Sequence, residues 1–168
     1  HVQGNTISVG SVDGTVASID ARTGGDLWRI SLDEPLAAGV GSDGKWTAVV
    51  SSRNEIVVLE AGRELWRKRL SSQVYTAPLV AGARIFVLGA DRSVTAFDAA
   101  NGARLWSVAR AGEPLVLRQP GVLLAVGDTL VTGSSGRLVG LNPDNGVVRW
   151  EAPLASSRGT NDLERLVH

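Results

Sequence analysis

The chain has 168 residues, enough for one domain or part of one, and 43% of them are hydrophobic, which suffices for a buried core. Its 17 basic and 17 acidic residues cancel, so we expect no electrostatic attraction to nucleic acid. Cysteine is absent, which excludes disulfides, thiolate nucleophiles and cysteine-based metal sites. The only histidines are His1 and His168, so no internal histidine can act as the base of a serine hydrolase triad.

Short alternating or apolar runs separated by turn residues predict strands along the whole chain. The first group shows only three predicted strands, 5–10, 15–20 and 26–32, so we expect this group to be incomplete. Three complete groups follow: 36–41, 45–51, 54–60 and 63–70; 76–81, 84–89, 93–99 and 104–109; 121–126, 129–133, 137–142 and 147–152. Beyond them, Asn161 and Glu164 have the spacing of a capping box, which predicts a short helix in 155–168, a segment that we expect to be a connection.

Four tryptophans close similar segments of the chain, at intervals of 38, 40 and 44 residues. These residues are Trp28, Trp66, Trp106 and Trp150. A period near 40 residues with strand-type composition is typical of β-propeller blades of four short strands. We therefore predict an all-β fold: a partial propeller of four-stranded antiparallel blades, over approximately 1–32 (incomplete), 36–70, 76–110 and 115–154.

The repeated segment, "FDAANGARLW" at 97–106, joins an acid, a glycine turn and a tryptophan. We expect Asp98 to accept hydrogen bonds from the turn, Gly102 to adopt a left-handed conformation and Trp106 to pack on a neighbouring blade. The equivalent residues are Asp20, Gly24 and Trp28, and Asn142, Gly146 and Trp150. Because the copy that ends at Trp66 has a shortened turn but keeps its tryptophan, we interpret the segment as a joint between blades rather than a ligand site.

Two further motifs match known sites only in their letters. "GVGSDG" (39–44) has the spacing of a dinucleotide-binding loop, but a predicted strand follows it where a helix N-terminus is required. "NPDNG" (142–146) resembles the start of a calcium loop, but the twelfth position is Pro153 where a bidentate glutamate is needed. We expect both motifs to be turns, and we expect no metal, no cofactor and no catalytic residue.

"SIDARTGGDLW" (18–28) resembles the tryptophan-docking pattern A-x-D-x-x-T-G-x-x-x-W of PQQ-type propeller repeats, with Ser18 in place of alanine. The segment 115–167, which contains "GRLVGLNPDNGVVRWEAP" and "RGTNDLERLV", resembles the BamB family of outer-membrane β-barrel assembly lipoproteins. The resemblance implies an eight-bladed propeller of which this chain looks like the N-terminal half. It also implies a non-catalytic scaffold, lipid-anchored in the full-length protein at the periplasmic face of the outer membrane.

The resemblance implies further that the chain binds BamA and assists the folding and insertion of outer-membrane proteins, with unfolded forms of those proteins as additional partners. The family's BamA-binding stretch corresponds here to Leu115, Leu117 and Arg118. From the residues alone, we would interpret the two leucines as inward residues of a first blade strand, and it is the resemblance that favours a partner site. Their flanking prolines and glycine also suit an exposed anchor in a loop.

Two alternative functions remain open at the level of sequence. One is a fragment of a PQQ-dependent quinoprotein dehydrogenase, although such enzymes usually place a vicinal disulfide against the quinone and this chain has no cysteine. The other is the ligand-sensing domain of a PQQ-repeat receptor. In any of these functions a half-propeller would expose the apolar faces of its end blades, so we also expect two copies to associate as a homodimer.

Overall fold

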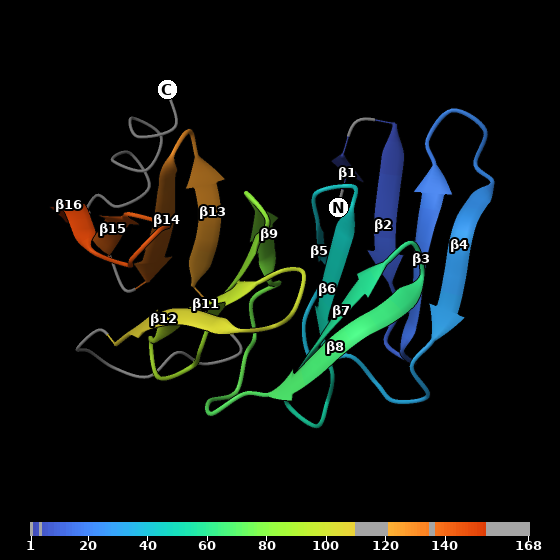
Figure 1. The fold of residues 1–168 in the computed structure, drawn as a ribbon, viewed down its shortest axis with the longest axis horizontal. Helices are drawn as coiled ribbons and strands as arrows, with labels where there is room; N and C mark the ends of the chain where they lie inside the picture. The colour runs from blue at the N-terminus through green and yellow to red at the C-terminus, as the bar shows by residue number, and fades with distance from the viewer. Residues whose placement is uncertain (1, 4, 110–120, 135–136, 154–168) are drawn as a thin grey trace.

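The computed structural model describes residues 2–3, 5–109, 121–134 and 137–153, which form four antiparallel sheets (Figure 1). The first sheet contains β1 (Val2–Gln3), β2 (Thr6–Gly10), β3 (Thr15–Asp20) and β4 (Asp26–Ser31). The second contains β5 (Gly41–Ser42), β6 (Trp46–Val50), β7 (Glu55–Glu60) and β8 (Arg63–Arg69). The third contains β9 (Leu79–Ala81), β10 (Arg84–Leu88), β11 (Val94–Asp98) and β12 (Arg104–Val108). The fourth contains β13 (Val122–Val126), β14 (Thr129–Ser134), β15 (Arg137–Leu141) and β16 (Val148–Pro153).

Each sheet is a meander in which strands pair in chain order, because short turns join antiparallel neighbours. The sheets follow one another along an arc, with the first and fourth at its two ends (Figure 1). The first strands of successive sheets approach one another, as β5 does β9 and β9 does β13. This arrangement confirms the predicted propeller of four-stranded blades, each sheet being one blade.

The structure corrects the expectation of an incomplete first blade. The fourth strand is β1, which pairs with β2 through Val2 opposite Ile7 and Gln3 opposite Thr6. Two residues are too few to show an alternating pattern, so the strand is not recognisable from the sequence. The predicted strand 36–41 is wrong over most of its length. A single bridge joins Leu36 to Ser51, and β5 begins only at Gly41.

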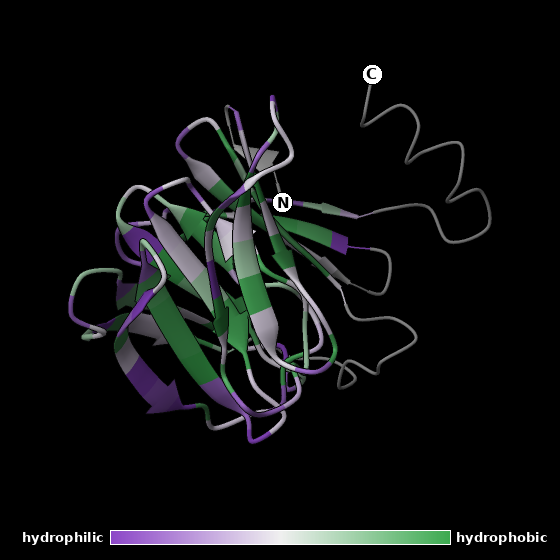
Figure 2. Ribbon diagram, turned by 90° about the vertical axis from the view of Figure 1, so that its right-hand side faces the viewer, coloured by the Kyte–Doolittle hydropathy of each residue, from purple (hydrophilic) through white to green (hydrophobic). Residues whose placement is uncertain are grey.

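The hydrophobic core lies between neighbouring sheets. Val16 of the first sheet packs with Val57 of the second, and Val58 packs in a cluster with Phe97 of the third. Phe86 and further side chains of the third sheet pack on the fourth. A central strand is therefore covered on both faces and reads as a continuous apolar run. Hydrophobic residues accordingly colour much of the inner strands, whereas the loops are mainly polar (Figure 2).

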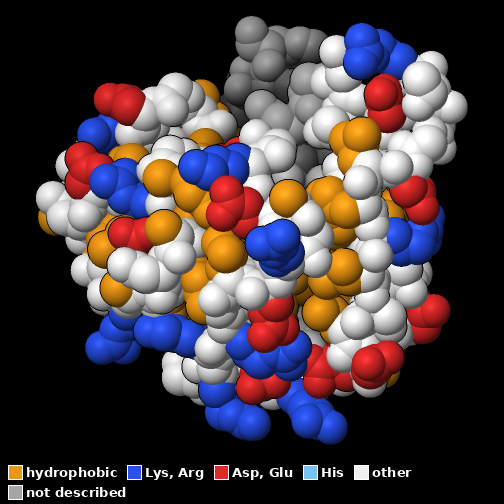
Figure 3. Space-filling model, turned by 45° about the vertical axis from the view of Figure 1, so that its right-hand side comes forward, with side chains coloured by type: hydrophobic (Ala, Val, Ile, Leu, Met, Phe, Trp, Pro, Cys, Tyr) orange, Lys and Arg blue, Asp and Glu red, His pale blue; other side chains and the backbone are white. Residues whose placement is uncertain are grey.

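The surface is mixed in charge, in keeping with the neutral composition. On the face drawn in Figure 3, acidic and basic side chains are interspersed, with hydrophobic side chains in small patches between them. Among the residues that the structure describes, no helix is long and apolar enough to cross a membrane. Nor do three or more potential metal-ligating side chains gather anywhere in this described part.

Candidate functional site

The segment predicted to bind a partner, with Leu115, Leu117 and Arg118, lies outside the described residues. Its place in the chain is nevertheless defined, because β12 of the third sheet ends at Val108 and β13 of the fourth begins at Val122. The segment thus belongs to the connection between two blades and to none of the repeated turns. The predicted helix within 155–168 also lies outside the described residues.

The repeated turns have the hydrogen bonds that their polar residue can accept. The side chain of Asp98 accepts the N–H of Ala100 at 2.9 Å, and its carbonyl accepts the N–H of Gly102 at 2.8 Å. Asp20 and Asn142 accept the equivalent side-chain bonds at 2.8 and 2.9 Å. Gly24, Gly102 and Gly146 all adopt φ near +76°, a left-handed conformation that glycine reaches without strain.

The tryptophans join consecutive sheets. Trp66 Nε1 donates to the carbonyl of Ala99 at 2.8 Å, and Trp106 Nε1 donates to that of Pro143 at 2.9 Å. In both pairs the acceptor lies in the turn of the following sheet. A Cβ atom added to Gly102 would lie 2.6 Å from Trp66 Cδ2, and one added to Gly146 would lie 2.7 Å from Trp106 Cε3. Each indole therefore packs flat against a glycine turn that has room for no side chain.

The shortened turn of the second sheet takes part in the same contact. Ala61 and Gly62 have φ of 50° and 80°, as a two-residue hairpin turn requires. A Cβ atom on Gly62 would lie 3.1 Å from Trp28 Cβ, so Trp28 packs here as the later tryptophans pack on their turns. The sequence comparison missed this partner because the turn lacks the aspartate and the length of the other copies.

Among the described residues, the two ends of the arc carry the two halves of this contact without the matching half beside them. Nothing lies within 4 Å of a Cβ atom added to Gly24, the glycine of the first sheet. At the other end Trp150 is 41% exposed, and Val147 and Val148 beside it are also exposed. One end thus presents an uncovered turn, and the other presents an uncovered indole.

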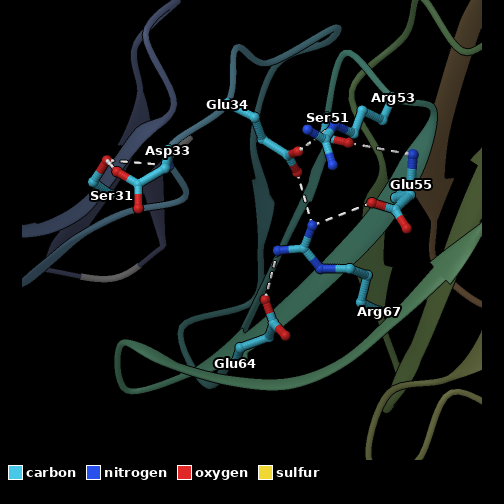
Figure 4. Close-up of polar contacts among 8 residues, drawn as sticks. All are labelled: Ser31, Asp33, Glu34, Ser51, Arg53, Glu55, Glu64 and Arg67. Atoms are coloured by element: carbon cyan, nitrogen blue, oxygen red, sulfur yellow. Dashed lines mark hydrogen bonds and ion pairs between the residues drawn. The ribbon is translucent and has the colours of Figure 1, made fainter.

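A network of ion pairs, which the sequence did not indicate, links the first and second sheets. Arg67 of β8 contacts Glu34 at 2.8 Å, Glu64 at 2.8 Å and Glu55 at 3.2 Å, while Arg53 contacts Glu34 at 3.4 Å (Figure 4). Glu34 comes from the connection between the sheets and its side chain is only 9% exposed. The hydrogen bond with Glu64, followed by those with Glu55 and Glu34, raises the pKa of Arg67. The network therefore ties the connection between the first two sheets to β8.

Two hollows lie between the later sheets. One, of about 180 Å³, lies between the third and fourth sheets beside Phe86 and Leu130. The other, of about 280 Å³, lies between the second and third sheets and is lined by cations and hydroxyls. Of its residues the sequence analysis singled out none, because they occupy ordinary positions of the repeat.

Of the two motifs with misleading spacing, 142–146 is a turn as predicted, whereas 39–44 is a short strand followed by a turn. Within 39–44, Gly41 and Ser42 form β5, and the chain turns at Gly44 into the strand β6. Within 142–146, the carbonyl of Asn142 accepts the N–H of Gly146 at 2.7 Å, which closes the hairpin between β15 and β16. No helix N-terminus stands behind the first of these described turns.

A protein-family model described as "Outer membrane protein assembly factor BamB" matches residues 12–168. The chain belongs to the BamB family. Relatives named outer membrane protein assembly factor BamB include that of Bordetella pertussis, 36% identical over 167 residues, and that of Burkholderia pseudomallei, 34% identical over 166 residues. These alignments cover 98% and 97% of this chain, but 43% and 44% of the relatives.

Solved structures share the fold at lower identity. BamB from Moraxella catarrhalis is 21% identical with a TM-score of 0.77, over 93% of this chain and 48% of that one. A quinohemoprotein alcohol dehydrogenase from Pseudomonas putida is 15% identical with a TM-score of 0.69, over 92% of this chain and 33% of that one. Likeness at such identity shows that the propeller fold is shared, and it says nothing about activity. The chain spans less than half the length of the BamB relatives that it matches.

Proposed function

We propose that this chain is part of a non-catalytic scaffold that assists the assembly of outer-membrane β-barrel proteins. The observation that carries the proposal is the family match over residues 12–168, together with relatives named as outer membrane protein assembly factors. In this function the protein works at the periplasmic face of the outer membrane, where a lipid anchor holds the full-length form. Its partners are BamA and unfolded outer-membrane proteins.

The proposed contact with BamA is formed by Leu115, Leu117 and Arg118 in the connection between the third and fourth sheets. Most of the repeated elements support this choice by elimination, since Trp28, Trp66 and Trp106 and the glycine turns that they meet are occupied by contacts between sheets. Two apolar anchors beside an arginine also have the composition of an interface hot spot, in which a few side chains supply most of the binding energy.

The test is a variant with Leu115→Ala, Leu117→Ala and Arg118→Ala. We expect its affinity for purified BamA, measured by calorimetry, to fall by about 100-fold, because the loss of two or three hot-spot side chains costs about 3 kcal/mol or more. We expect the thermal unfolding temperature to stay close to that of the unchanged protein, because the replaced residues lie in the connection between β12 and β13 rather than in a described strand.

A matched control makes the same three replacements on the outer strands. Leu65 and Leu105 are exposed, and Arg63 is exposed at the start of β8, so Leu65→Ala, Leu105→Ala and Arg63→Ala remove the same groups elsewhere. BamA affinity should not change in this control. Unchanged affinity in the first variant, with the protein folded, would refute the assignment of the contact.

We propose also that two copies of the chain associate through the ends of the arc. The uncovered Gly24 turn at one end and the exposed Trp150 at the other support this, because they complement each other as Gly102 and Trp66 do inside the protein. Light scattering of the isolated chain should give a dimer mass, and Trp150→Ala should shift it toward the monomer. A strict monomer at high protein concentration would contradict the association.

A further inference from the structure

The groove between the second and third sheets differs in its chemistry from the other two contacts between sheets. Its polar lining consists of Lys68, Arg69, Ser71, Thr95, Arg104 and Ser107. Phe97, which is 5% exposed, and Leu70 lie beneath these groups. The groove thus combines two cations, Lys68 and Arg104, and three hydroxyls over an apolar base in a space of about 280 Å³. Arg69 borders the groove, but alternation along β8 places its side chain on the face that carries Arg67.

The repeats show what the same positions hold elsewhere. Lys68 stands two residues after Trp66, where the first sheet has Ile30 and the third has Val108. Ile30 packs on the cluster that contains Val57, and Val108 packs on the cluster that contains Val139. Both contacts between sheets are closed by apolar side chains at this level.

On the opposite wall of the groove, Thr95 is likewise polar where the equivalent positions of the other sheets are apolar. Val57 pairs with Arg67 across its sheet, and Val139 pairs with Glu151, whereas Thr95 pairs with Ser107. The hydroxyls of Thr95 and Ser107 lie 3.0 Å apart, so one donates to the other and a second hydroxyl proton remains to be donated. Lys68 and Thr95 are therefore both polar and face each other across this contact. At the other contacts between sheets the two equivalent positions are both apolar.

The cations of the groove have no carboxylate to neutralise them within the described part of the chain. Arg67, by contrast, has three such partners in the contact between the first two sheets. Glu55 stands opposite Arg69 across β7 and β8, but its carboxylate is bonded to Arg67. The connection that supplies Glu34 to the first contact has only serines and a glutamine, 71–73, at the second.

We propose that this groove binds a small oxyanion, a carboxylate or a phosphate group, through Lys68 and Arg104. Charge-assisted hydrogen bonds from ammonium and guanidinium groups are the strong contacts that such anions make, and the spare hydroxyl proton adds a donor. The apolar base lowers the local dielectric constant and strengthens the attraction. The proposal rests on other residues than the BamA contact proposed above and does not depend on it.

The test is calorimetric titration of the purified protein with inorganic phosphate and, separately, with an acetylated hexapeptide of glutamates. The double variant Lys68→Ile and Thr95→Val installs the residue types of the neighbouring contacts, so the sheets should still pack. We expect its affinity for the anion to be about tenfold or more weaker, because a charged donor is lost. Arg104→Gln, which leaves the contact between the sheets unchanged, should weaken binding similarly and serves if the double variant does not fold.

Arg63→Gln is the matched control, because it removes one positive charge from the same strand outside the groove. It should leave the affinity unchanged. Saturable binding of phosphate alone would identify a free anion as the ligand, and tighter binding of the peptide would identify protein carboxylates; both support the site. The proposal is overturned if neither probe binds saturably, or if Arg63→Gln weakens binding as much as the groove variants do.

Discussion

Two glycines with nearly the same φ differ in what lies against them. This difference predicts how much the contact between a tryptophan and a glycine turn contributes to the free energy of unfolding. Gly24 and Gly102 have φ of 76° and 77°. A Cβ atom at Gly24 would meet nothing within 4 Å, whereas one at Gly102 would meet Trp66 Cδ2 at 2.6 Å and Cε3 at 2.7 Å. Replacement of each by alanine therefore imposes the same backbone strain, but only Gly102→Ala displaces an indole.

The magnitudes follow from these contacts. An alanine held in the left-handed region costs about 1 kcal/mol, which is the whole expected effect of Gly24→Ala. In Gly102→Ala the ring of Trp66 must also move, at about 1 kcal/mol or more for overpacking. Its 2.8 Å hydrogen bond to Ala99 then weakens, at about 1 kcal/mol. We expect a total near 3 kcal/mol, so that the two variants differ by about 2 kcal/mol.

The assay is urea unfolding of both variants and the unchanged protein, followed by far-ultraviolet circular dichroism at low protein concentration. Low concentration keeps the Gly24 turn uncovered by a second copy. The variant at Gly102 should show the lower midpoint with a similar denaturant slope. Equal destabilisation by the two replacements would refute the reasoning, because the indole contact would then contribute nothing beyond the backbone strain.

Two further predictions concern charged side chains. Arg67→Met should lower the free energy of unfolding by about 3 kcal/mol, because the nearly buried Glu34 then keeps only the exposed Arg53 as a partner. The control is Arg29→Met, which breaks one exposed ion pair with Asp26. It should have little effect on the same urea unfolding curve. Partial burial raises the pKa of Asp91, but hydrogen bonds from Ser93 and Ser72 outweigh it and bring the pKa below the ordinary 3.8. The stability that Asp91 contributes is present above its unfolded-state pKa and is lost as pH falls below about 4, so Asp91→Asn should flatten that part of the stability–pH curve; an unchanged curve would contradict this role.

Much of the local structure could be predicted because it depends on residues close together in the chain. The spacing of Trp28, Trp66, Trp106 and Trp150 predicted the repeat, and the strands of the last three sheets lie within a few residues of their expected bounds, apart from the short β5. The glycine turns were predictable because a left-handed residue after an aspartate or asparagine is a local requirement. The two-residue β1 was missed because a strand so short has no period to detect.

The two candidate sites also differ in how far the sequence alone could indicate them. The proposed BamA-binding residues came from resemblance to a family, and they remain a prediction because they lie outside the described residues. The groove could have been noticed by aligning the repeats, which sets Lys68 against Ile30 and Val108. That alignment would still have lacked the facing Thr95, since its place opposite Lys68 depends on how two sheets pack.

The sequence by itself therefore determined most of the strands, the hairpin turns and the period that makes each sheet a blade, but not the two-residue strands β1 and β5. Only the tertiary structure decided which groups come together between blades: Trp66 with Gly102, Glu34 with Arg67, and Lys68 with Thr95, which line one groove. The physical reason is the distance along the chain. Turns and alternation are set within about ten residues, whereas these contacts join residues more than 25 positions apart, whose meeting depends on the packing of whole sheets.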